Sequence, residues 1–452
     1  MESALISSEQ LLLFVKKIAE PMRNPEWVKS IVLSKSNLNP DPLFDQSYWS
    51  DVSLASGYPG VLLLLVELDS RFPDERWDAA IHAHILKIKE SIESFGISYF
   101  PLYGGLTGVC FSLQQASKNG TRYQSLIATL NAYLIDKIAP HYLFPLQKNL
   151  DAFQPSPPAL YDVVQGIVGI GVYALLNFNQ PAFRDLAIQI IRLLIALTHP
   201  IKITDNIVPG WYTPLVYQFL EKDKKLYPAG NFNLGLAHGA PGILAFLSVA
   251  LLHGVEIQGQ REAMQRVVDW LYNYRSEKDH HVFWQARISF EEQISGIREE
   301  ISFFPRDAWC YGTPGVARSL FLAGKALENE ELKMFAFRAF LTIFDRDRSQ
   351  WHLPGPTLCH GISGLLMITR QMAQDTQSSE LHEKTSFLKK ILLEYYQPQY
   401  PFGFRDLEPS KNGKNIEIDK AGFLEGAAGT LLSLIDDPCS NWYAPLLISD
   451  RK

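Results

Sequence analysis

The sequence has few cysteines and no excess of positive charge, and each shortage excludes a class of protein. Four cysteines, at positions 110, 310, 359 and 439, are too few in 452 residues for a disulfide framework. In a reducing compartment such thiols fill the core, bind a metal or act as nucleophiles. The net charge of −6 gives no basic surface for nucleic acid, so we expect no nucleic-acid partner.

Long apolar runs are also missing. The N-terminus has no early basic residue, and its apolar run at residues 11–15 is too short for a signal peptide. The most apolar segment, residues 186–197, is interrupted by Gln189 and Arg192, and no stretch approaches the roughly 18 apolar residues of a membrane helix. We therefore expect a cytoplasmic protein that could associate peripherally with a membrane only through partners.

A Gly-x-x-Gly step followed by an apolar run occurs seven times along the chain. Proline occupies the third position in three copies, which suits the first turn of a helix. Glycine permits a sharp turn and the close approach of another backbone. Each copy therefore predicts the start of a helix, and several of these helices are apolar nearly all round, which indicates burial on every side. The copies begin at Gly57, Gly105, Gly166, Gly239, Gly312, Gly361 and Gly426.

Amphipathic segments, such as residues 76–95 and 381–396, alternate with the apolar ones and predict an outer layer over an inner layer of helices. Seven such pairs are compatible with an open solenoid or with a closed ring. Two longer gaps, residues 201–234 and 280–304, carry strand-like patterns and predict β-rich insertions at one rim. We expect residues 1–452 to form one all-α domain with these insertions.

Three copies carry reactive side chains just before the first glycine: His238, Cys310 and the Cys359–His360 pair. If the inner helices surround a common axis, these helix starts converge. Two cysteines and one histidine suit zinc, and three protein ligands leave the open position of a catalytic site. Neighbouring residues point about 100° apart within a helix, so Cys359 and His360 can face one ion only from the turn before it.

The charge of such a centre indicates its chemistry. Two thiolates and a neutral imidazole cancel the double positive charge of zinc. A third thiolate, supplied by a substrate, would make the centre net negative, so that this sulfur is deprotonated near neutral pH and remains electron-rich. Such a site suits alkylation of a thiol better than polarisation of a carbonyl group.

Taken singly, the candidates also have ordinary structural explanations. Cys110 and Cys439 are expected to be inert core residues, as most lone cysteines are. Asp162, four residues before Gly166, would alone be a helix N-cap, and His238 would alone be a core or helix-start histidine about as often as a catalytic one. The equivalent placement of the two cysteine motifs against the repeat favours the functional interpretation.

The segments Trp309-Cys310-Tyr311-Gly312 and Cys359-His360-Gly361, on a Gly-x-x-Gly helical repeat, resemble the lanthionine synthetase C family, the lantibiotic cyclases, and in particular the nisin cyclase type. The resemblance covers nearly the whole chain, through Gly-Phe-Leu-Glu-Gly at 422–426. It implies an all-α fold, an α/α toroid of about seven inner and seven outer helices with a small appended β-containing region. It also implies zinc held by Cys310, Cys359 and His360.

The implied reaction is the closure of thioether rings in a dehydrated peptide. Peptide cysteine thiolates add to dehydroalanine or dehydrobutyrine and form lanthionine or methyllanthionine. The resemblance carries over Asp162, His238, Arg306 and Tyr311 as catalytic residues. We expect His238 to be the general acid that protonates the α-carbon, Asp162 to orient it or to accept the thiol proton, and Arg306 to stabilise the enolate oxygen or to hold Asp162.

The implied partners are a dehydrated precursor peptide with an N-terminal leader, a dehydratase and an ABC-type export transporter. Three other interpretations remain open from the sequence. One is a prenyltransferase-like toroid, which also activates a peptide thiol with zinc. Another is a non-catalytic zinc-bearing module that binds glutathione or a signalling partner. The third, a structural helical-repeat scaffold, leaves the reactive residues unexplained.

Overall fold

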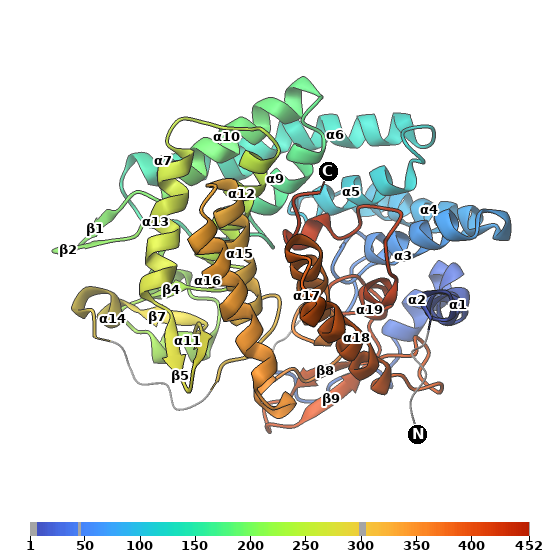
Figure 1. Ribbon diagram of the computed structural model, residues 1–452. Helices are drawn as coiled ribbons and strands as arrows, with labels where there is room; N and C mark the ends of the chain where they lie inside the picture. Colours follow the sequence, from blue (N-terminus) through green and yellow to red (C-terminus); the bar gives the residue numbers. More distant parts are fainter. Residues whose placement is uncertain (1–6, 44–46, 298–303, 452) are drawn as a thin grey trace. The chain divides into compact units, whose positions relative to one another are not determined.

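The computed structural model describes residues 7–43, 47–297 and 304–451 (Figure 1). The chain divides into two compact units, each assembled from two stretches of sequence. Unit 1 comprises Met1–Ala132 and Pro354–Trp442, and unit 2 comprises Tyr133–Leu353 and Tyr443–Lys452. The expectation of a single domain over residues 1–452 stays a prediction.

All seven Gly-x-x-Gly copies begin a helix, as the sequence predicts, and the first glycine is the N-cap residue each time. These helices are buried along most of their length, because their apolar residues surround the helix axis. In unit 1 they are α3 (Tyr58–Arg71), α5 (Leu106–Ala116), α17 (Ile362–Thr376) and α19 (Ala427–Leu434). In unit 2 they are α9 (Ile167–Leu176), α12 (Ala240–Leu252) and α15 (Thr313–Ala326).

More amphipathic helices cover the buried ones in unit 1. Helix α4 packs on α3, α18 on α17, and α1 on α19. The inward face of α4 carries Ile81, Ile85 and Ile88 at helical spacing, all buried, and each contributes about 1.5–3 kcal/mol by leaving water. The remaining helices here are α1 (Ser8–Ala19), α2 (Pro25–Val32), α4 (Trp77–Phe95) and α18 (Ser379–Glu394), while α6 (Gln124–Ile138) spans the unit boundary.

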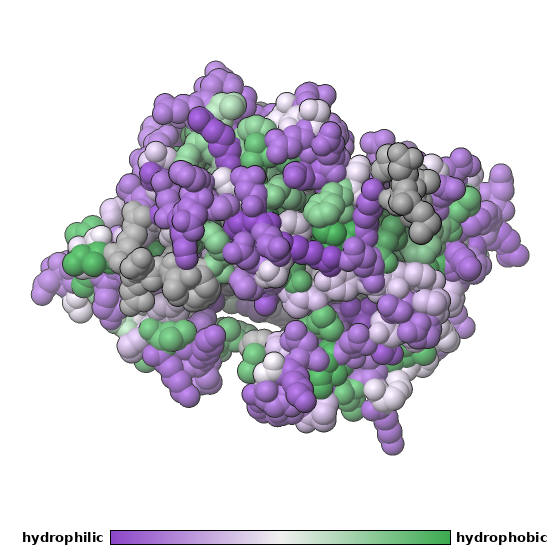
Figure 2. All heavy atoms as spheres, turned by 60° about the horizontal axis from the view of Figure 1, so that its bottom comes forward, coloured by the Kyte–Doolittle hydropathy of each residue, from purple (hydrophilic) through white to green (hydrophobic). Residues whose placement is uncertain are grey.

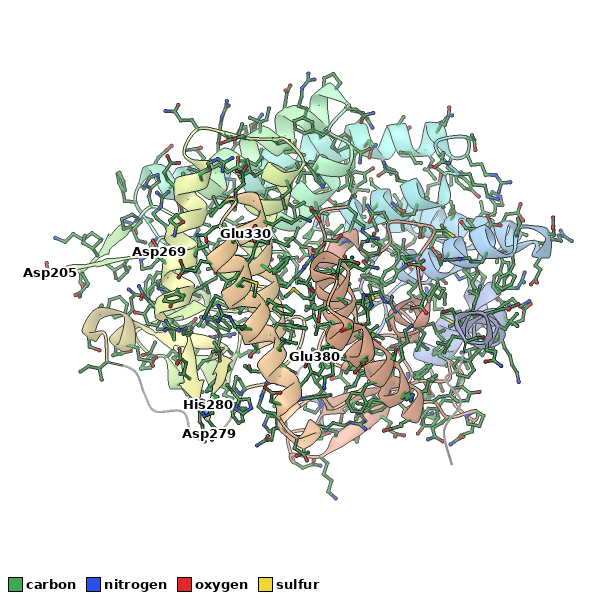
Figure 3. All side chains as sticks on the ribbon, in the orientation of Figure 1. Asp205, Asp269, Asp279, His280, Glu330 and Glu380 are labelled. Atoms are coloured by element: carbon green, nitrogen blue, oxygen red, sulfur yellow. The ribbon has the colours of Figure 1, made fainter. Side chains whose placement is uncertain are left out.

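Unit 2 repeats this arrangement of layers. Helix α10 packs on α9, α13 on α12, and α16 on α15. Acidic residues begin several outer helices, such as Glu330 in α16, where the positive end of the helix dipole favours them (Figure 3). The outer and connecting helices are α7 (Phe144–Asp151), α8 (Pro158–Tyr161), α10 (Pro181–Leu197), α11 (Glu221–Leu226), α13 (Gln260–Asn273), α14 (Phe290–Ser295) and α16 (Glu330–Leu341).

Short antiparallel strands lie in and beside the two segments for which the sequence predicts them. A three-stranded sheet in the order β3-β4-β7 places Phe232 opposite both Tyr212 and Ile288. Residues 298–303, near the end of the second predicted segment, lie outside the described residues. The unit 2 strands are β1 (Ile201–Ile203), β2 (Asn206–Val208), β3 (Tyr212–Thr213), β4 (Asn231–Asn233), β5 (Ser276–Lys278), β6 (His281–Phe283) and β7 (Arg287–Ser289).

The hairpin of β5 and β6 shows how local sequence shapes these insertions. Asp279 and His280 both adopt positive φ in the two-residue turn between β5 and β6, as such tight turns require. Both residues are exposed at the tip of this hairpin (Figure 3), so His280 does not belong to a buried site. The sequence analysis missed the hairpin of β8 (Asp406–Pro409) and β9 (Asn415–Ile418) in unit 1.

The turns before the buried helices are joined to one another by backbone hydrogen bonds. In unit 1 the N–H of Ala55 donates to Tyr103 (2.9 Å), that of Leu424 to Ala55 (3.0 Å), and that of Cys359 to Leu424 (2.9 Å). Each of these four residues stands two positions before the first glycine of its copy. The bonds therefore place four helix starts, far apart in sequence, side by side.

Unit 2 has a similar ladder, in which the first donor stands three positions before its glycine instead of two. The N–H of Val163 donates to the carbonyl of Ala237 (3.1 Å), and the N–H of Ala237 donates to that of Cys310 (3.4 Å). The turn before α15 is the tightest, because Gly312 has φ +99° and a Cβ there would lie 1.7 Å from the carbonyl oxygen of Arg306. The glycine is therefore required by both conformation and space.

Polar residues cover most of the face seen in Figure 2, with apolar atoms visible in small groups between them. Among the described residues, no helix combines the length and the apolar character that crossing a membrane requires.

Candidate functional site

Cys359 and His360 lie in the turn before α17 in unit 1, as the sequence predicts, and both are partly exposed. The ladder bond from the Cys359 N–H to Leu424 fixes this turn beside the turn before α19. The cysteine sulfur, a ring nitrogen of His360 and a carboxylate oxygen of Glu425 all lie within 4.8 Å of one another. A thiolate, an imidazole and a carboxylate at this spacing are able to share one cation, and the first two are preferred ligands of zinc.

The His360 ring is held from behind by Asp406, the first residue of β8. Its Nε2 lies 3.2 Å from the Asp406 Oδ1, and the Asp406 side chain is fully buried. Burial raises the pKa of Asp406, but Lys420 and His360 outweigh that effect and hold the pKa well below its usual range. The carboxylate is therefore ionised where it faces the imidazole.

A buried lysine, Lys420, lies among three carboxylates of unit 1. Its Nζ is 3.0 Å from the Asp406 Oδ2 and 2.9 Å from the Glu425 Oε2, and it also pairs with Glu408. Burial lowers the pKa of Lys420, but Glu425, Asp406 and Glu408 together raise it well above its usual value. The ammonium group thus occupies the place that a cation would take between Asp406, Glu408 and Glu425, which leaves the Cys359–His360 side for a metal.

In unit 2 the structure brings His238 and Asp162 together. The His238 Nδ1 lies 2.6 Å from the Asp162 Oδ2, the Asp162 side chain is 1% exposed, and that of His238 is 35% exposed. The other oxygen of Asp162 accepts the backbone N–H groups of Gln165 (2.5 Å) and Gly166 (3.0 Å). Asp162 is therefore both a cap in the turn before α9 and the partner of the imidazole.

This pairing determines the form of the imidazole. A carboxylate accepts hydrogen bonds only, so the proton of neutral His238 lies on Nδ1 and the lone pair lies on Nε2. Nε2 is then the atom that takes up and delivers a proton. Both oxygens of Asp162 are engaged, which favours the orienting role for Asp162 over acceptance of a thiol proton.

Tyr311, two residues before α15, is held by two donors. Its hydroxyl oxygen accepts from the Asn233 Nδ2 (3.1 Å) and the Arg287 Nη2 (3.3 Å). The Asn233 Oδ1 accepts the N–H of Gly235 (2.8 Å), which identifies the amide nitrogen as the atom that faces the phenol. Because both partners donate, the hydroxyl proton of Tyr311 takes part in neither of these two hydrogen bonds. Burial raises the pKa of Tyr311 and Arg287 opposes the rise, so the phenol remains a proton donor.

The Tyr311 ring lies beside His238, with ring centroids 6.3 Å apart. Cys310 is buried in the same turn of unit 2, and its carbonyl accepts the N–H of Ala237. Arg306 is exposed, and in the part of the chain that the structure describes it forms no ion pair with Asp162. Asp162, His238, Tyr311 and Cys310 thus share unit 2, whereas Cys359 and His360 belong to unit 1.

The two cysteines outside the motifs differ from each other. Cys110 is fully buried in α5, and burial raises the pKa of its thiol, which agrees with the core role expected for it. The expectation that Cys439 fills the core is wrong, because Cys439 is exposed. Helix α19 ends at Leu434, and the polar segment that follows carries Cys439 to the surface.

Sequence reasoning missed Glu425, although a signal for it was present. Glu425 stands directly before Gly426, just as His238, Tyr311 and His360 stand directly before the first glycine of their copies. Applying that position to all seven copies would have found it.

No comparable signal in the sequence marked four other residues of the site, Asp406, Lys420, Asn233 and Arg287. All four lie in or beside the short strands and have no fixed spacing from the repeat. Their roles depend on contacts that only the fold creates.

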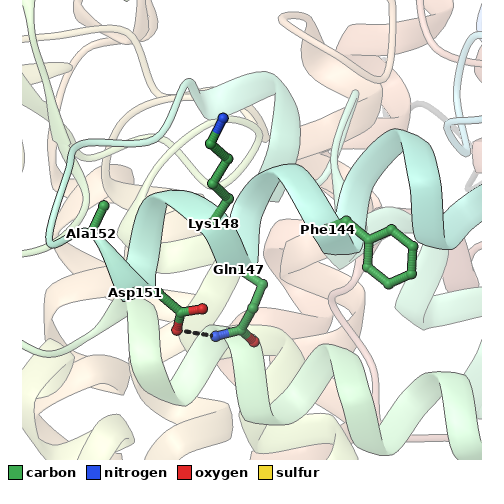
Figure 4. Close-up of a pocket in the computed structure, with 5 residues that line it drawn as sticks. All are labelled: Phe144, Gln147, Lys148, Asp151 and Ala152. Carbon is green, nitrogen blue, oxygen red and sulfur yellow. Dashed lines mark hydrogen bonds between the residues drawn. The ribbon is translucent and has the colours of Figure 1, made fainter.

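A surface hollow over α7 in unit 2 contains none of the expected residues. It is lined by Phe144, Gln147, Lys148, Asp151 and Ala152, with the Gln147 amide donating to Asp151 at 2.6 Å (Figure 4). All five come from one helix and the residue after it, and they include no thiol or imidazole, so the hollow plays no part in the site.

Comparison with known proteins identifies the family and the fold. Residues 48–442 match the family model described as lanthionine synthetase C-like protein. The nisin biosynthesis protein NisC of Lactococcus lactis subsp. lactis is 26% identical over 390 residues, which cover 85% of each chain. The structure of nisin cyclase superposes with a TM-score of 0.78 and 23% identity, over 97% of this chain and 98% of that one.

The structural match confirms the expected fold class, an all-α protein of the α/α toroid type. The family match extends over most of the chain and includes the turns that carry His238, Cys310, Cys359 and His360. The chain therefore belongs to the lanthionine synthetase C-like family.

Proposed function

We propose that the protein is a zinc-dependent lantibiotic cyclase that closes lanthionine and methyllanthionine rings in a dehydrated precursor peptide. The observation that carries the proposal is that the Cys359 sulfur and a His360 ring nitrogen lie within 4.8 Å of each other, with the buried Asp406 beside the imidazole. The similarity to NisC, a nisin biosynthesis protein, supports the choice of reaction. Proposed partners are the leader-bearing precursor, a dehydratase and an ABC-type transporter in one biosynthetic complex.

The proposed zinc ligands are Cys359, His360 and Cys310. Thiolate sulfur and imidazole nitrogen are the donors that zinc prefers, and the residues of unit 1 fit this metal. The inclusion of Cys310 depends on its Trp-Cys-Tyr-Gly motif. When bound, zinc would lower the pKa of a visiting peptide thiol and make the thiolate available near neutral pH.

The residues of unit 2 would complete the addition. As the peptide sulfur bonds to the β-carbon of the dehydroamino acid, the C=C electron pair moves to the α-carbon and its carbonyl group, and the α-carbon then takes a proton. His238, protonated at Nε2 and oriented by Asp162, would deliver that proton. Tyr311 has a hydroxyl proton to donate to the enolate oxygen, and exposed Arg306 offers a positive charge to the same oxygen.

The test is zinc analysis combined with a thiol count. Ring closure adds S–H across C=C without a change of mass, so alkylation of the remaining thiols followed by mass spectrometry reports each ring. We expect the wild-type protein to contain zinc and to remove thiols from a dehydrated precursor peptide, and Cys359→Ala to lose both properties. Cys439→Ala is the matched control and should keep both, because Cys439 lies at the surface outside the motifs.

Two results would contradict the proposal. A full zinc content in Cys359→Ala would refute the ligand assignment. Zinc binding with an unchanged thiol count on several dehydrated peptides would favour the non-catalytic zinc-bearing module, and glutathione binding would then be measured. Incubation of the protein and a thiol peptide with an isoprenoid diphosphate tests the prenyltransferase-like alternative. Transfer of the isoprenoid to the peptide would favour that alternative over the cyclase.

A further inference from the structure

We infer that Asp406 is a positioning residue that selects the nitrogen with which His360 binds the metal. The inference rests on the proposed role of His360 as a zinc ligand. The Asp406 Oδ1 lies 3.2 Å from the His360 Nε2, and the geometry assigns the ring proton to Nε2 because a carboxylate only accepts. A neutral imidazole has one N–H group, so Nδ1 holds the lone pair that a metal needs.

Asp406 is itself held in place. Its side chain is fully buried, and its second oxygen is fixed by Lys420 at 3.0 Å. Asp406 pairs with Ile418 across the β8–β9 hairpin, and Lys420 lies two residues after β9. The segment of residues 406–420, which has no place in the repeat of helices, thus supplies both the carboxylate beside His360 and the cation that anchors this carboxylate.

Lys420 also determines where a metal ion is able to lie. Asp406, Glu408 and Glu425 come close enough to hold a cation themselves, but the ammonium of Lys420 already bonds to all three. A divalent cation there would meet this positive charge at close range. The metal is therefore directed to the side of the cluster that carries Cys359 and His360.

Groups behind a metal-bound histidine raise its basicity and fix its ring, and their removal weakens metal binding about 10- to 100-fold. We expect this loss in Asp406→Ala. Asp406→Asn keeps the size and an accepting oxygen but not the charge, so we expect a loss of about tenfold. A contact that only stabilises the fold would lower the melting temperature and leave the zinc affinity of the folded protein unchanged.

The experiment measures zinc affinity of the full-length protein by competition with a chromophoric chelator. It uses the wild type, His360→Ala, Asp406→Ala and Asp406→Asn, with melting curves in EDTA as a check of folding. Asp419→Ala is the matched control, because Asp419 is a nearby carboxylate whose side chain is 7% exposed and pairs with Arg405 instead of His360. Its zinc affinity should equal that of the wild type.

A second readout is the visible spectrum of the Co²⁺-substituted protein. The d–d bands should change in Asp406→Asn, because the imidazole becomes a weaker donor without the negative charge behind it, and should stay constant in Asp419→Ala. If Asp406→Ala does not fold, the zinc affinity and cobalt spectrum of Asp406→Asn test the inference instead.

The outcomes separate the two proposals. No zinc in the wild type, or wild-type affinity in His360→Ala, contradicts the proposed ligand role itself. Weak binding in His360→Ala together with wild-type affinity and an unchanged cobalt spectrum in Asp406→Asn overturns the inference about Asp406 alone.

Discussion

Replacement of Lys420 by methionine should destabilise unit 1 strongly. The lysine side chain is 3% exposed and lies against Asp406, Glu408 and Glu425, so its removal leaves three carboxylates with no buried counter-charge. Loss of one partner from a buried ion pair costs about 3–5 kcal/mol. For a folding unit of this size each kcal/mol lowers the melting temperature by about 2–4 °C, so we expect a decrease of about 6–20 °C.

The decrease should depend on pH with a definite sign. In the wild type the pKa of Lys420 is raised above 10.5, because the three carboxylates outweigh burial, so its stabilisation is present below pH 10.5 and is lost as the pH rises through the raised value. The pKa of Asp406 is lowered, so its contribution is present above about pH 4 and is lost as the pH falls.

Without Lys420 the carboxylates should bind protons at a higher pH than in the wild type. The deficit in stability should therefore be largest near about pH 8 and should shrink towards about pH 5.

Thermal melting followed by circular dichroism in EDTA measures the effect without a bound metal. Lys411→Met is the control, because Lys411 is 65% exposed and lies 4.0 Å from Asp41, a pair worth at most about 1 kcal/mol. Excess Ca²⁺ should recover part of the loss in Lys420→Met, because the three carboxylates are close enough to hold an ion. A decrease that is the same at every pH, or no decrease at all, would refute the reasoning.

Three further predictions follow from the geometry. His238→Asn should slow ring closure about 10²- to 10⁴-fold without lowering the zinc content, and wild-type turnover in that variant would remove His238 from the mechanism. Glu425→Gln should keep its zinc, measured by mass spectrometry of the metal, because the Glu425 carboxylate is held by Lys420; loss of zinc would make it a ligand. Gly312→Ala should lower the unfolding free energy by more than about 2 kcal/mol, because its Cβ would lie 1.7 Å from a carbonyl oxygen, whereas Gly254→Ala, with positive φ but open space, should cost less.

The repeat made the helical framework predictable. A Gly-x-x-Gly step before an apolar run states where a helix begins and that it is buried, and the structure has a helix at every copy. The positions of Cys359 and His360 in a turn followed from the same pattern, because their distance from Gly361 is a property of the sequence.

Other parts of the site depend on contacts between residues with no fixed spacing. Asp406 reaches His360 through a hairpin that lies 46 residues later in the chain, and Lys420 reaches Asp406 across that hairpin. Arg287 reaches Tyr311 from a strand whose three residues show no pattern by themselves. The surface position of Cys439 was missed because a single cysteine near an apolar helix gives no indication of where that helix ends.

In the ladder of turns, the backbone joins the helix starts and the side chains supply the chemistry. In unit 1 main-chain atoms two positions before each glycine join neighbouring helix starts, so none of these bonds depends on which side chain stands one position later. A designer can therefore change the side chain at this position, for example at Ser56 or Gln165, without removing a ladder bond. Gly104 is not such a position, because a Cβ there would lie 2.7 Å from the Tyr99 ring.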